Sequence, residues 1–297
     1  MASGRFALSG IIAVWFVVAA SLQKPPSAVQ PPAAGTARTR LTWYGHSAFR
    51  LVTPAQHVVL IDPWITNPSN PHGKQDVADL KDVDLILISH GHADHVGDAL
   101  DILRRTEARV VTSFDQAQAY RRHLGFPAER VDYDSVGNVG GTLSFFDGEV
   151  KVTLVNAVHG SSLSYRENRD VRVEPAGNPV GFVISVRNGP TVYHTGDTDV
   201  FGDMRLIGEL HRPDIALLPI GGHYTMGPRE AAKAVELLGV KHVIPIHYGT
   251  FPLLSGTPDQ FRASLAERGL GDVTVYALEP GGLARVKAPA AAAAAVS

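Results

Sequence analysis

The sequence feature that most restricts the fold is a group of three histidines and one aspartate in the segment SHGHADH, residues 89–95. Residues 84–88, DLILI, precede this segment and have the length and branching of a buried strand. Residues 98–105 follow it with apolar side chains at helical spacing. The segment therefore lies where a strand leads into a helix, which is the edge at which open α/β sheets bind ligands.

The side chains of this segment predict a metal site. Its four candidate ligands are His90, His92, Asp94 and His95. Neutral imidazole and carboxylate are the usual ligands of Zn²⁺ and similar divalent ions. A solvated polar turn is the alternative, but it does not account for four ligand-type side chains in so short a stretch.

The pattern His-x-His-x-Asp-His resembles that of the metallo-β-lactamase superfamily, and the resemblance extends over about residues 40–286. Three further superfamily positions follow in order. His159 ends an apolar run, Asp197 stands in the segment HTGDT, and His247 follows the strand-like segment KHVIPI. The resemblance implies His90, His92 and His159 on one metal ion and Asp94, His95 and His247 on a second. It also implies that Asp197 bridges the two ions.

Residues 43–47, WYGHS, and residues 61–63, IDP, resemble the branch that holds L-ascorbate-6-phosphate lactonase and uncharacterised metal-dependent hydrolases. We expect four residues to take part in catalysis, namely Asp94, His46, His223 and Tyr224. The alternative for His46 is a structural hydrogen bond at a strand end. His194 is expected to hold a ligand in place without being one.

Strand-like and helix-like segments alternate along the chain, which indicates the α/β class. The resemblance implies a four-layer αβ/βα sandwich in which two mixed sheets face each other and helices lie outside. Among the individual elements, we expect helices at residues 116–124 and 228–238, a hairpin turn at Asp147 and Gly148, and a final strand at residues 273–278. Residues 160–178 are expected to form a polar loop, either a lid with arginines or a solvated surface segment.

The termini differ from the rest of the chain in composition. Arg5 and an apolar stretch up to Ser21 are typical of a secretory signal peptide, with an uncleaved membrane anchor as the alternative. We expect an extended Pro/Ala-rich linker at residues 22–40, a hydrolase domain at 41–287 and a disordered tail at 288–297. The protein is therefore expected to be exported, to the periplasm or outside the cell, and to meet a membrane only through the anchor.

Net charge and cysteine content limit the function classes. The formal net charge is −2 and no basic block is present, which argues against a nucleic-acid partner. The chain has no cysteine and hence no thiolate ligand or disulfide. We expect two divalent ions, Zn²⁺ by ligand type with Mn²⁺ or Fe²⁺ as alternatives.

The expected reaction is hydrolysis of a small-molecule ester, lactone or phosphoester by a hydroxide held between the two ions. The alternatives are an exported metallo-β-lactamase and a non-catalytic metal-binding protein. The β-lactamases lack the bridging aspartate that Asp197 resembles. A nuclease with a large inserted domain is disfavoured because only 50 residues (247 − 197) separate Asp197 from His247.

Overall fold

The computed structural model describes residues 38–285. The predicted signal peptide, most of the predicted linker and the predicted tail lie outside this range, although Arg40, the last residue of that linker, already belongs to the first strand. None of the helices within residues 38–285 has both the length and the apolar character needed to cross a membrane.

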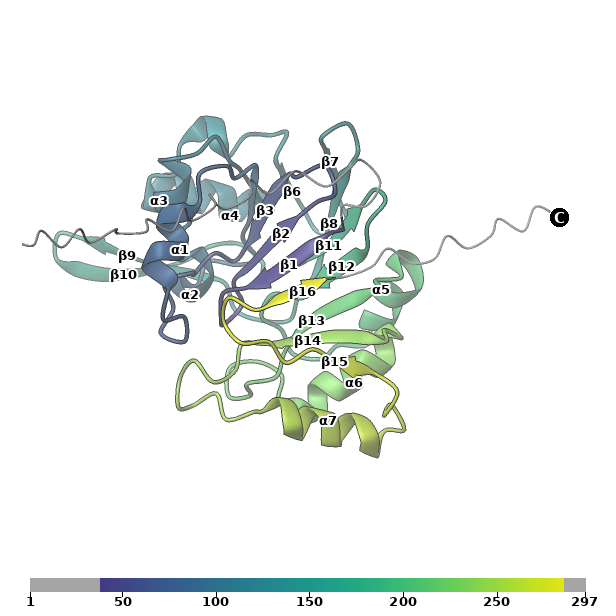
Figure 1. Ribbon diagram of the computed structural model, residues 1–297. Coiled ribbons are helices and arrows are strands. Elements are labelled where there is room, and N and C mark those ends of the chain that lie inside the picture. Colours follow the sequence, from purple (N-terminus) through teal and green to yellow (C-terminus); the bar gives the residue numbers. More distant parts are fainter. Residues whose placement is uncertain (1–37, 286–297) are drawn as a thin grey trace, which may run out of the picture. The chain divides into compact units, whose positions relative to one another are not determined.

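Two seven-stranded mixed sheets form the centre of the domain (Figure 1). In spatial order the first sheet contains β16 (Leu283–Arg285), β1 (Arg40–Trp43), β2 (Phe49–Val52), β3 (Val58–Ile61), β4 (Leu85–Leu87), β5 (Arg109–Ser113) and β6 (Val136–Gly137). The second sheet contains β15 (Thr274–Val275), β14 (His242–Ile246), β13 (Ile215–Pro219), β12 (Thr191–His194), β11 (Val180–Val186), β8 (Val150–Asn156) and β7 (Thr142–Phe145).

Helices cover the outer face of each sheet (Figure 1). The first sheet carries α1 (Gly73–Asp79), α2 (Ala93–Val96), α3 (Ala99–Leu103), α4 (Phe114–Ala119), a π-helical turn η1 (Tyr120–Leu124) and a 3₁₀ turn η2 (Ala128–Arg130). The second sheet carries α5 (Met204–His211), α6 (Pro228–Leu238) and α7 (Pro258–Glu267). The four-layer sandwich expected from the resemblance is therefore confirmed.

The side chains of each strand point alternately to its two faces, which explains how one sheet packs against both the other sheet and the helices. In β3, Val59 and Ile61 pack between the two sheets, whereas Val58 and Leu60 pack under the helices of the first sheet. Successive side chains of a strand point to opposite faces, so an entirely apolar strand can serve two cores. The second sheet has the same construction, with Phe182 between the sheets and Val183 facing the helices.

The sequence prediction was wrong in two places, and in a third it placed the start of a helix two residues too late. Residues 160–178 are not a loop, because β9 (Ser162–Glu167) and β10 (Asp170–Pro175) pair there as an antiparallel hairpin. The strand expected at residues 273–278 is only the two residues of β15, and the final strand is β16, which pairs with β1. The helix expected at residues 116–124 starts at Phe114 and ends as a π-helical turn.

Candidate metal centre

The predicted site residues follow strands that end at the same edge of the sheets. Strands β3 and β4 are parallel, and β12, β13 and β14 are parallel. Strand β8 runs parallel to β12 because each pairs antiparallel with β11. This edge carries His46 after β1, residues 89–95 after β4, His159 after β8, Asp197 after β12 and His247 after β14.

Ser89, the first residue of the segment 89–95, anchors that segment to Asp62. Ser89 donates hydrogen bonds from its backbone N–H and its Oγ to the carboxylate of Asp62, each at 2.7 Å. The Ser89 hydroxyl proton is therefore in use, so His90 Nδ1 donates to Ser89 Oγ at 3.0 Å. This arrangement leaves the Nε2 lone pair of His90 directed toward the other ligands.

One group of candidate ligands consists of His90, His92 and His159, whose ring nitrogens lie within 4.8 Å of one another. His90 Nε2 is 3.0 Å from His92 Nδ1. Two imidazole lone pairs at this distance repel each other unless a proton or a cation lies between them. Burial lowers the pKa of all three rings, which keeps them neutral and able to bind a cation.

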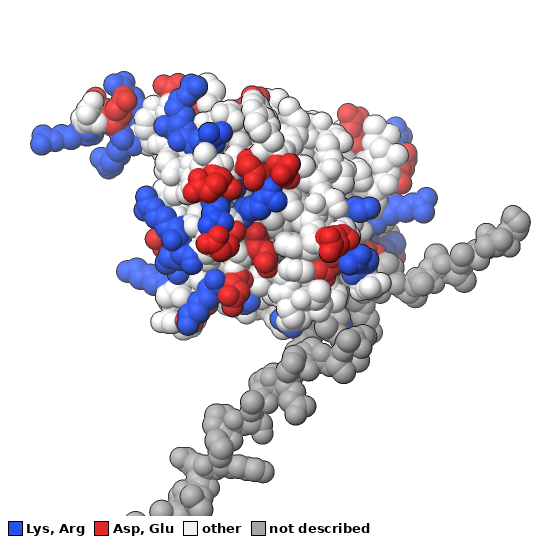
Figure 2. Space-filling model, turned by 90° about the horizontal axis from the view of Figure 1, so that it is seen from above, with Lys and Arg blue, Asp and Glu red and all other residues white. Residues whose placement is uncertain are grey.

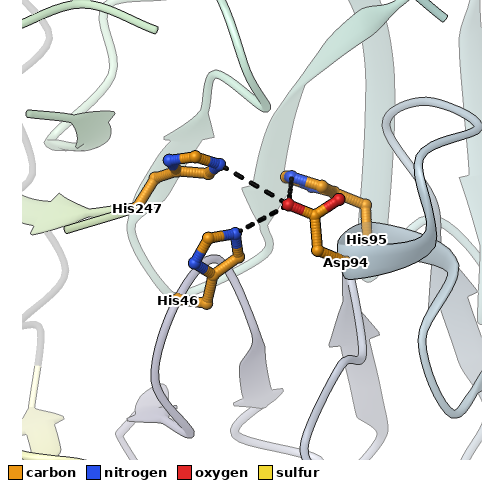
Figure 3. A group of neighbouring side chains, drawn as sticks. All are labelled: His46, Asp94, His95 and His247. Carbon is orange, nitrogen blue, oxygen red and sulfur yellow. Dashed lines mark hydrogen bonds and ion pairs between the residues drawn. The ribbon is translucent and has the colours of Figure 1, made fainter. Parts of the chain in front are cut away.

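The second group consists of Asp94, His95 and His247, and His46 lies beside them (Figure 3). Asp94 Oδ2 is 3.8 Å from His247 Nε2 and 4.0 Å from His95 Nε2. Helix α2 starts at Ala93 and therefore directs Asp94 and His95 from adjacent positions of its first turn. Two residues here have a strained backbone, since φ is 51° at His46 and 52° at His247.

Asp197 lies between the two groups. Its Oδ2 is 3.0 Å from His247 Nε2, 3.2 Å from His95 Nε2, 3.6 Å from His159 Nε2 and 3.9 Å from His90 Nε2. One carboxylate oxygen thus faces two histidines of each group. This position is the one that a bridging ligand requires.

Three buried polar atoms of the candidate ligands have no hydrogen-bond partner, namely His95 Nε2, Asp197 Oδ1 and His247 Nδ1. A buried polar atom without a partner is unfavourable by about 1–3 kcal/mol. Nitrogen and carboxylate oxygen donors of this kind match Zn²⁺, Mn²⁺ and Fe²⁺. The residues present therefore fit a pair of divalent cations.

The pKa values in the metal-free protein reflect the same charges. Burial alone would lower the pKa of His247, but Asp197 and Asp94 outweigh burial and raise it to about 9. For His95, burial is likewise outweighed by Asp197 and Asp62, and the pKa is raised. Burial disfavours the charged form of Asp197, yet His247 and His95 hold its pKa well below the usual range.

Asp62 is a site residue that we did not predict. It is fully buried, and its Oδ2 accepts a hydrogen bond from His95 Nδ1 at 2.8 Å. Such a carboxylate orients a histidine so that the other ring nitrogen faces the metal. The available signal was its position, since Asp62 follows a strand just as the ligands do.

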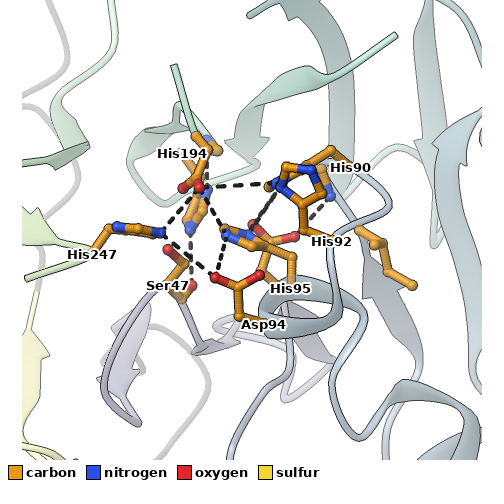
Figure 4. A network of polar contacts seen from close by, with 12 residues as sticks. Ser47, His90, His92, Asp94, His95, His194 and His247 are labelled. Carbon is orange, nitrogen blue, oxygen red and sulfur yellow. Dashed lines mark hydrogen bonds and ion pairs between the residues drawn. The ribbon is translucent and has the colours of Figure 1, made fainter. Parts of the chain in front are cut away.

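His194 holds the backbone next to Asp197 in place, as expected for a residue that supports a ligand without being one (Figure 4). Its Nδ1 accepts a hydrogen bond from the backbone N–H of Gly196 at 3.1 Å, and its Nε2 donates to the Ser47 carbonyl at 3.0 Å. His194 therefore holds the backbone next to Asp197 and does not reach the carboxylate itself.

His46 is completely buried and joins two segments of the site. Its Nε2 lies 3.0 Å from Asp94 Oδ2, and its Nδ1 lies 2.9 Å from Thr250 Oγ1. Burial lowers the pKa of His46 to about 4, so the ring carries one proton. A carboxylate can only accept, hence Nε2 donates to Asp94 and Nδ1 accepts from Thr250. Without metal, His46 holds Asp94 in place.

The remaining predicted residues lie in exposed positions. His223 and Tyr224 follow β13 in a turn, and Tyr224 is 60% exposed. Neither hydrogen-bonds to the candidate ligands, so both are free to face a substrate. The side chains of the β9–β10 hairpin are mostly exposed, and Arg172 pairs with Glu167 at 3.2 Å. The hairpin extends outward beyond α1 (Figure 1).

Two sheets with outer helices and a histidine-rich centre at one edge are the arrangement of the metallo-β-lactamase fold. The family described as "Beta-lactamase superfamily domain" matches residues 57–248. A UPF0173 metal-dependent hydrolase of Thermodesulfovibrio yellowstonii is 45% identical over 237 residues, which cover 80% of this chain and 88% of that protein. Its counterpart in Myxococcus xanthus is 47% identical over 258 residues, 86% of each chain.

A solved structure agrees with the sequence relatives. Igni18, described as a novel metallo hydrolase from the archaeon Ignicoccus hospitalis, is 36% identical, with a TM-score of 0.69. The similarity covers 83% of this chain and 97% of that one. The present chain belongs to the UPF0173 metal-dependent hydrolase family of the β-lactamase superfamily.

Proposed function

We propose that this metal-dependent hydrolase binds two divalent cations and hydrolyses a small ester, lactone or phosphoester. The proposed ligands of the first cation are His90, His92 and His159, and those of the second are Asp94, His95 and His247. Asp197 would bridge them. The observation that carries the proposal is the position of Asp197 Oδ2, 3.0–3.9 Å from ring nitrogens of both groups.

When bound, the cations would lower the pKa of a water molecule and polarise the scissile carbonyl or phosphoryl group. The chain itself provides the geometry around them. Asp94 is the more accessible carboxylate, with 29% of its side chain exposed against 3% for Asp197. Burial disfavours the charged form of Asp94, but His247 at 3.8 Å and the hydrogen bond from His46 outweigh burial and hold the pKa of Asp94 well below its usual range. Asp94 is therefore a weak base that orients a water by accepting a hydrogen bond.

His223 and Tyr224 supply exposed donors at the same edge, suited to the negative charge that develops on the substrate oxygen. The metal is proposed to be Zn²⁺ because all proposed ligands are histidine nitrogens or aspartate carboxylates. Mn²⁺ and Fe²⁺ suit the same ligands. The relatives are described as metal-dependent hydrolases, which supports the reaction class and leaves the substrate open.

A panel of lactones, phosphodiesters and β-lactams, compared at equal metal loading, tests the proposal. A bridged pair suits an oxygen leaving group, whereas a β-lactam expels an amide nitrogen. We expect measurable kcat/KM for a lactone or phosphoester and little for a β-lactam, with the Asp197→Ala variant as the inactive control. A preference of more than about tenfold for the β-lactam, about 1.4 kcal/mol, would assign the chain to the β-lactamases. Tight metal binding without turnover of any class would favour a metal-binding protein.

A further inference from the structure

Two aromatic side chains form an exposed surface next to His46. Trp64 and Phe251 stack with ring centroids 5.8 Å apart and an interplanar angle of 25°. Both rings also meet the His46 ring edge-on, at 5.3 and 5.9 Å. Phe251 remains 39% exposed and Trp64 is half-buried. Because His46 contacts Asp94, this aromatic pair lies one residue away from a proposed metal ligand.

The position of Phe251 is fixed relative to the metal centre. The segment 248–256 starts directly after His247, and Thr250 bonds to His46, which bonds to Asp94. Leu254 is buried and lies where a Cβ on Gly221 would touch it, 3.1 Å away. The segment is therefore held at three points, and the exposure of Phe251 is not a sign of a loose loop.

The two segments that carry the aromatic pair contain no Lys, Arg, Asp or Glu. This is true of residues 63–73, PWITNPSNPHG, and of residues 248–258, YGTFPLLSGTP. On the face shown in Figure 2, acidic and basic side chains lie next to one another. Leu253, in the second segment, is 54% exposed. The carboxylates of Asp98 and Asp76 accept hydrogen bonds from Thr66 and Asn70 of the first segment. The aromatic rings themselves are apolar and favour hydrocarbon over a charged group.

We propose that Trp64 and Phe251 form an apolar wall that binds the hydrocarbon part of the substrate, so that the preferred substrates are esters or lactones with an alkyl or aryl substituent. This inference rests on the proposed function for the reaction, but not for the binding. Burial of each methylene against such a wall strengthens binding by a factor of about four. Trp64 and Phe251 are specificity-determining residues and take no part in the bond-breaking step.

Binding of alkyl hydroxamates to the zinc-loaded protein tests the wall without requiring turnover. The hydroxamate group would anchor at the cations, and calorimetry would compare Kd from acetohydroxamate to octanohydroxamate. We expect the Kd to fall at least tenfold along the series for the wild type. Phe251→Ala should remove most of this dependence on chain length, and Phe251→Leu should restore part of it. Acetohydroxamate should bind all variants within about twofold.

Phe114→Ala is the matched control. Phe114 is 36% exposed and stacks on Tyr133 at 6.0 Å and 22°, so it resembles Phe251 in exposure and packing. It lines a separate cavity of about 160 Å³ with Arg121 and Asp132. The control should keep the wild-type chain-length dependence. If the Kd of the wild type did not depend on chain length, or if Phe251→Ala kept the wild-type dependence, the proposed apolar wall would be refuted.

An activity assay distinguishes the proposed reaction from the proposed apolar wall. The kcat/KM for γ-lactones should rise with the length of the alkyl substituent in the wild type and not in Phe251→Ala. If hydroxamates show the chain-length dependence while no ester, lactone or phosphoester is hydrolysed, the proposed reaction is wrong and the wall stands. If short lactones are hydrolysed without any effect of chain length, the reaction stands and the wall is wrong.

Discussion

Asp62 Oδ2 lies 2.8 Å from His95 Nδ1, and both side chains are fully buried although 33 residues separate them in the chain. The same carboxylate accepts two hydrogen bonds from Ser89. One buried carboxylate thus supports the metal-binding segment at two points. The rotamer of His95 depends on it, and this dependence can be measured.

Asp62→Asn should weaken metal binding. An amide has one acceptor oxygen where the carboxylate has two, so either His95 Nδ1 or the backbone N–H of Ser89 would lose its acceptor, and the negative charge beside His95 would be gone. We expect metal affinity to fall roughly 10–100-fold, as is typical when such a partner is removed. Metal titration monitored by calorimetry measures the change, and excess metal should restore activity. Asp101→Asn, at a carboxylate that is 65% exposed, is the control. Unchanged affinity in Asp62→Asn would contradict the supporting role.

Asp197→Asn should lower metal binding and activity more than the loss of a supporting residue such as Asp62. It eliminates the charge that faces both groups of histidines, so we expect a lower metal content per chain and a loss of activity greater than 100-fold, roughly the upper bound for supporting residues. Elemental analysis and kcat/KM are the measurements, and circular dichroism checks the fold. Asp199→Asn, at an exposed aspartate two residues further on, should behave as wild type. An Asp197→Asn protein that keeps two metals and full activity would disprove the bridge.

Metal binding should release protons. In the metal-free protein the pKa of His247 is about 9, so its ring is protonated at pH 7.5, and the pKa of His95 is raised as well. A cation needs the lone pairs and must displace these protons, hence apparent affinity should rise with pH until about pH 9 and fall on acidification. Calorimetry in buffers of different ionisation enthalpy counts the protons. His247→Ala should release fewer, and heat that is independent of the buffer would contradict the prediction.

Glu149 should stabilise the opposite edge of the domain in a pH-dependent manner. Its carboxylate, with 6% of the side chain exposed, accepts a hydrogen bond from Ala55 N–H at 3.1 Å and contacts His57 Nδ1 at 2.5 Å. Burial would raise its pKa, but the hydrogen bonds from Thr53, His57 and Ala55 outweigh burial and lower it below 4.5. A lowered pKa means that the contribution is present above pH 4.5 and is lost as the pH falls through the folded-state value.

We therefore expect Glu149→Gln to lower the free energy of unfolding of the metal-free protein by about 1–3 kcal/mol at pH 7. The difference from wild type should shrink below pH 4.5. Urea unfolding at pH 7 and at a pH below 4.5 measures this difference in the free energy of unfolding. Glu107→Gln, at a glutamate that is 90% exposed and paired with Arg130, should change stability by less than about 1 kcal/mol. A Glu149→Gln effect that is equal at both pH values would rule out the carboxylate as its source.

Local chemistry allowed several elements to be predicted from the sequence. Helix α6 was placed correctly at residues 228–238 because Pro228 suits the first helical turn and Gly239 ends it with φ of 67°. The hairpin turn at Asp147 and Gly148 follows from the same kind of local preference, with φ of 50° and 79°. The α/β class was evident from the alternation of strand-like and helix-like segments, and residues 90–95 were evident as ligand-type residues after an apolar strand. The other ligand positions were implied by the resemblance to the superfamily.

Tertiary structure decided what depends on contacts between distant residues. The support of His95 by Asp62 and of Asp94 by His46 requires strands from separate parts of the chain to end side by side, and no local preference encodes a partner many residues away. The pairing of β16 with β1 and the hairpin of β9 and β10 likewise depend on which segments meet. The sequence by itself therefore determined the type of chemistry and the fold class, whereas packing of the two sheets decided which side chains hold the site in place.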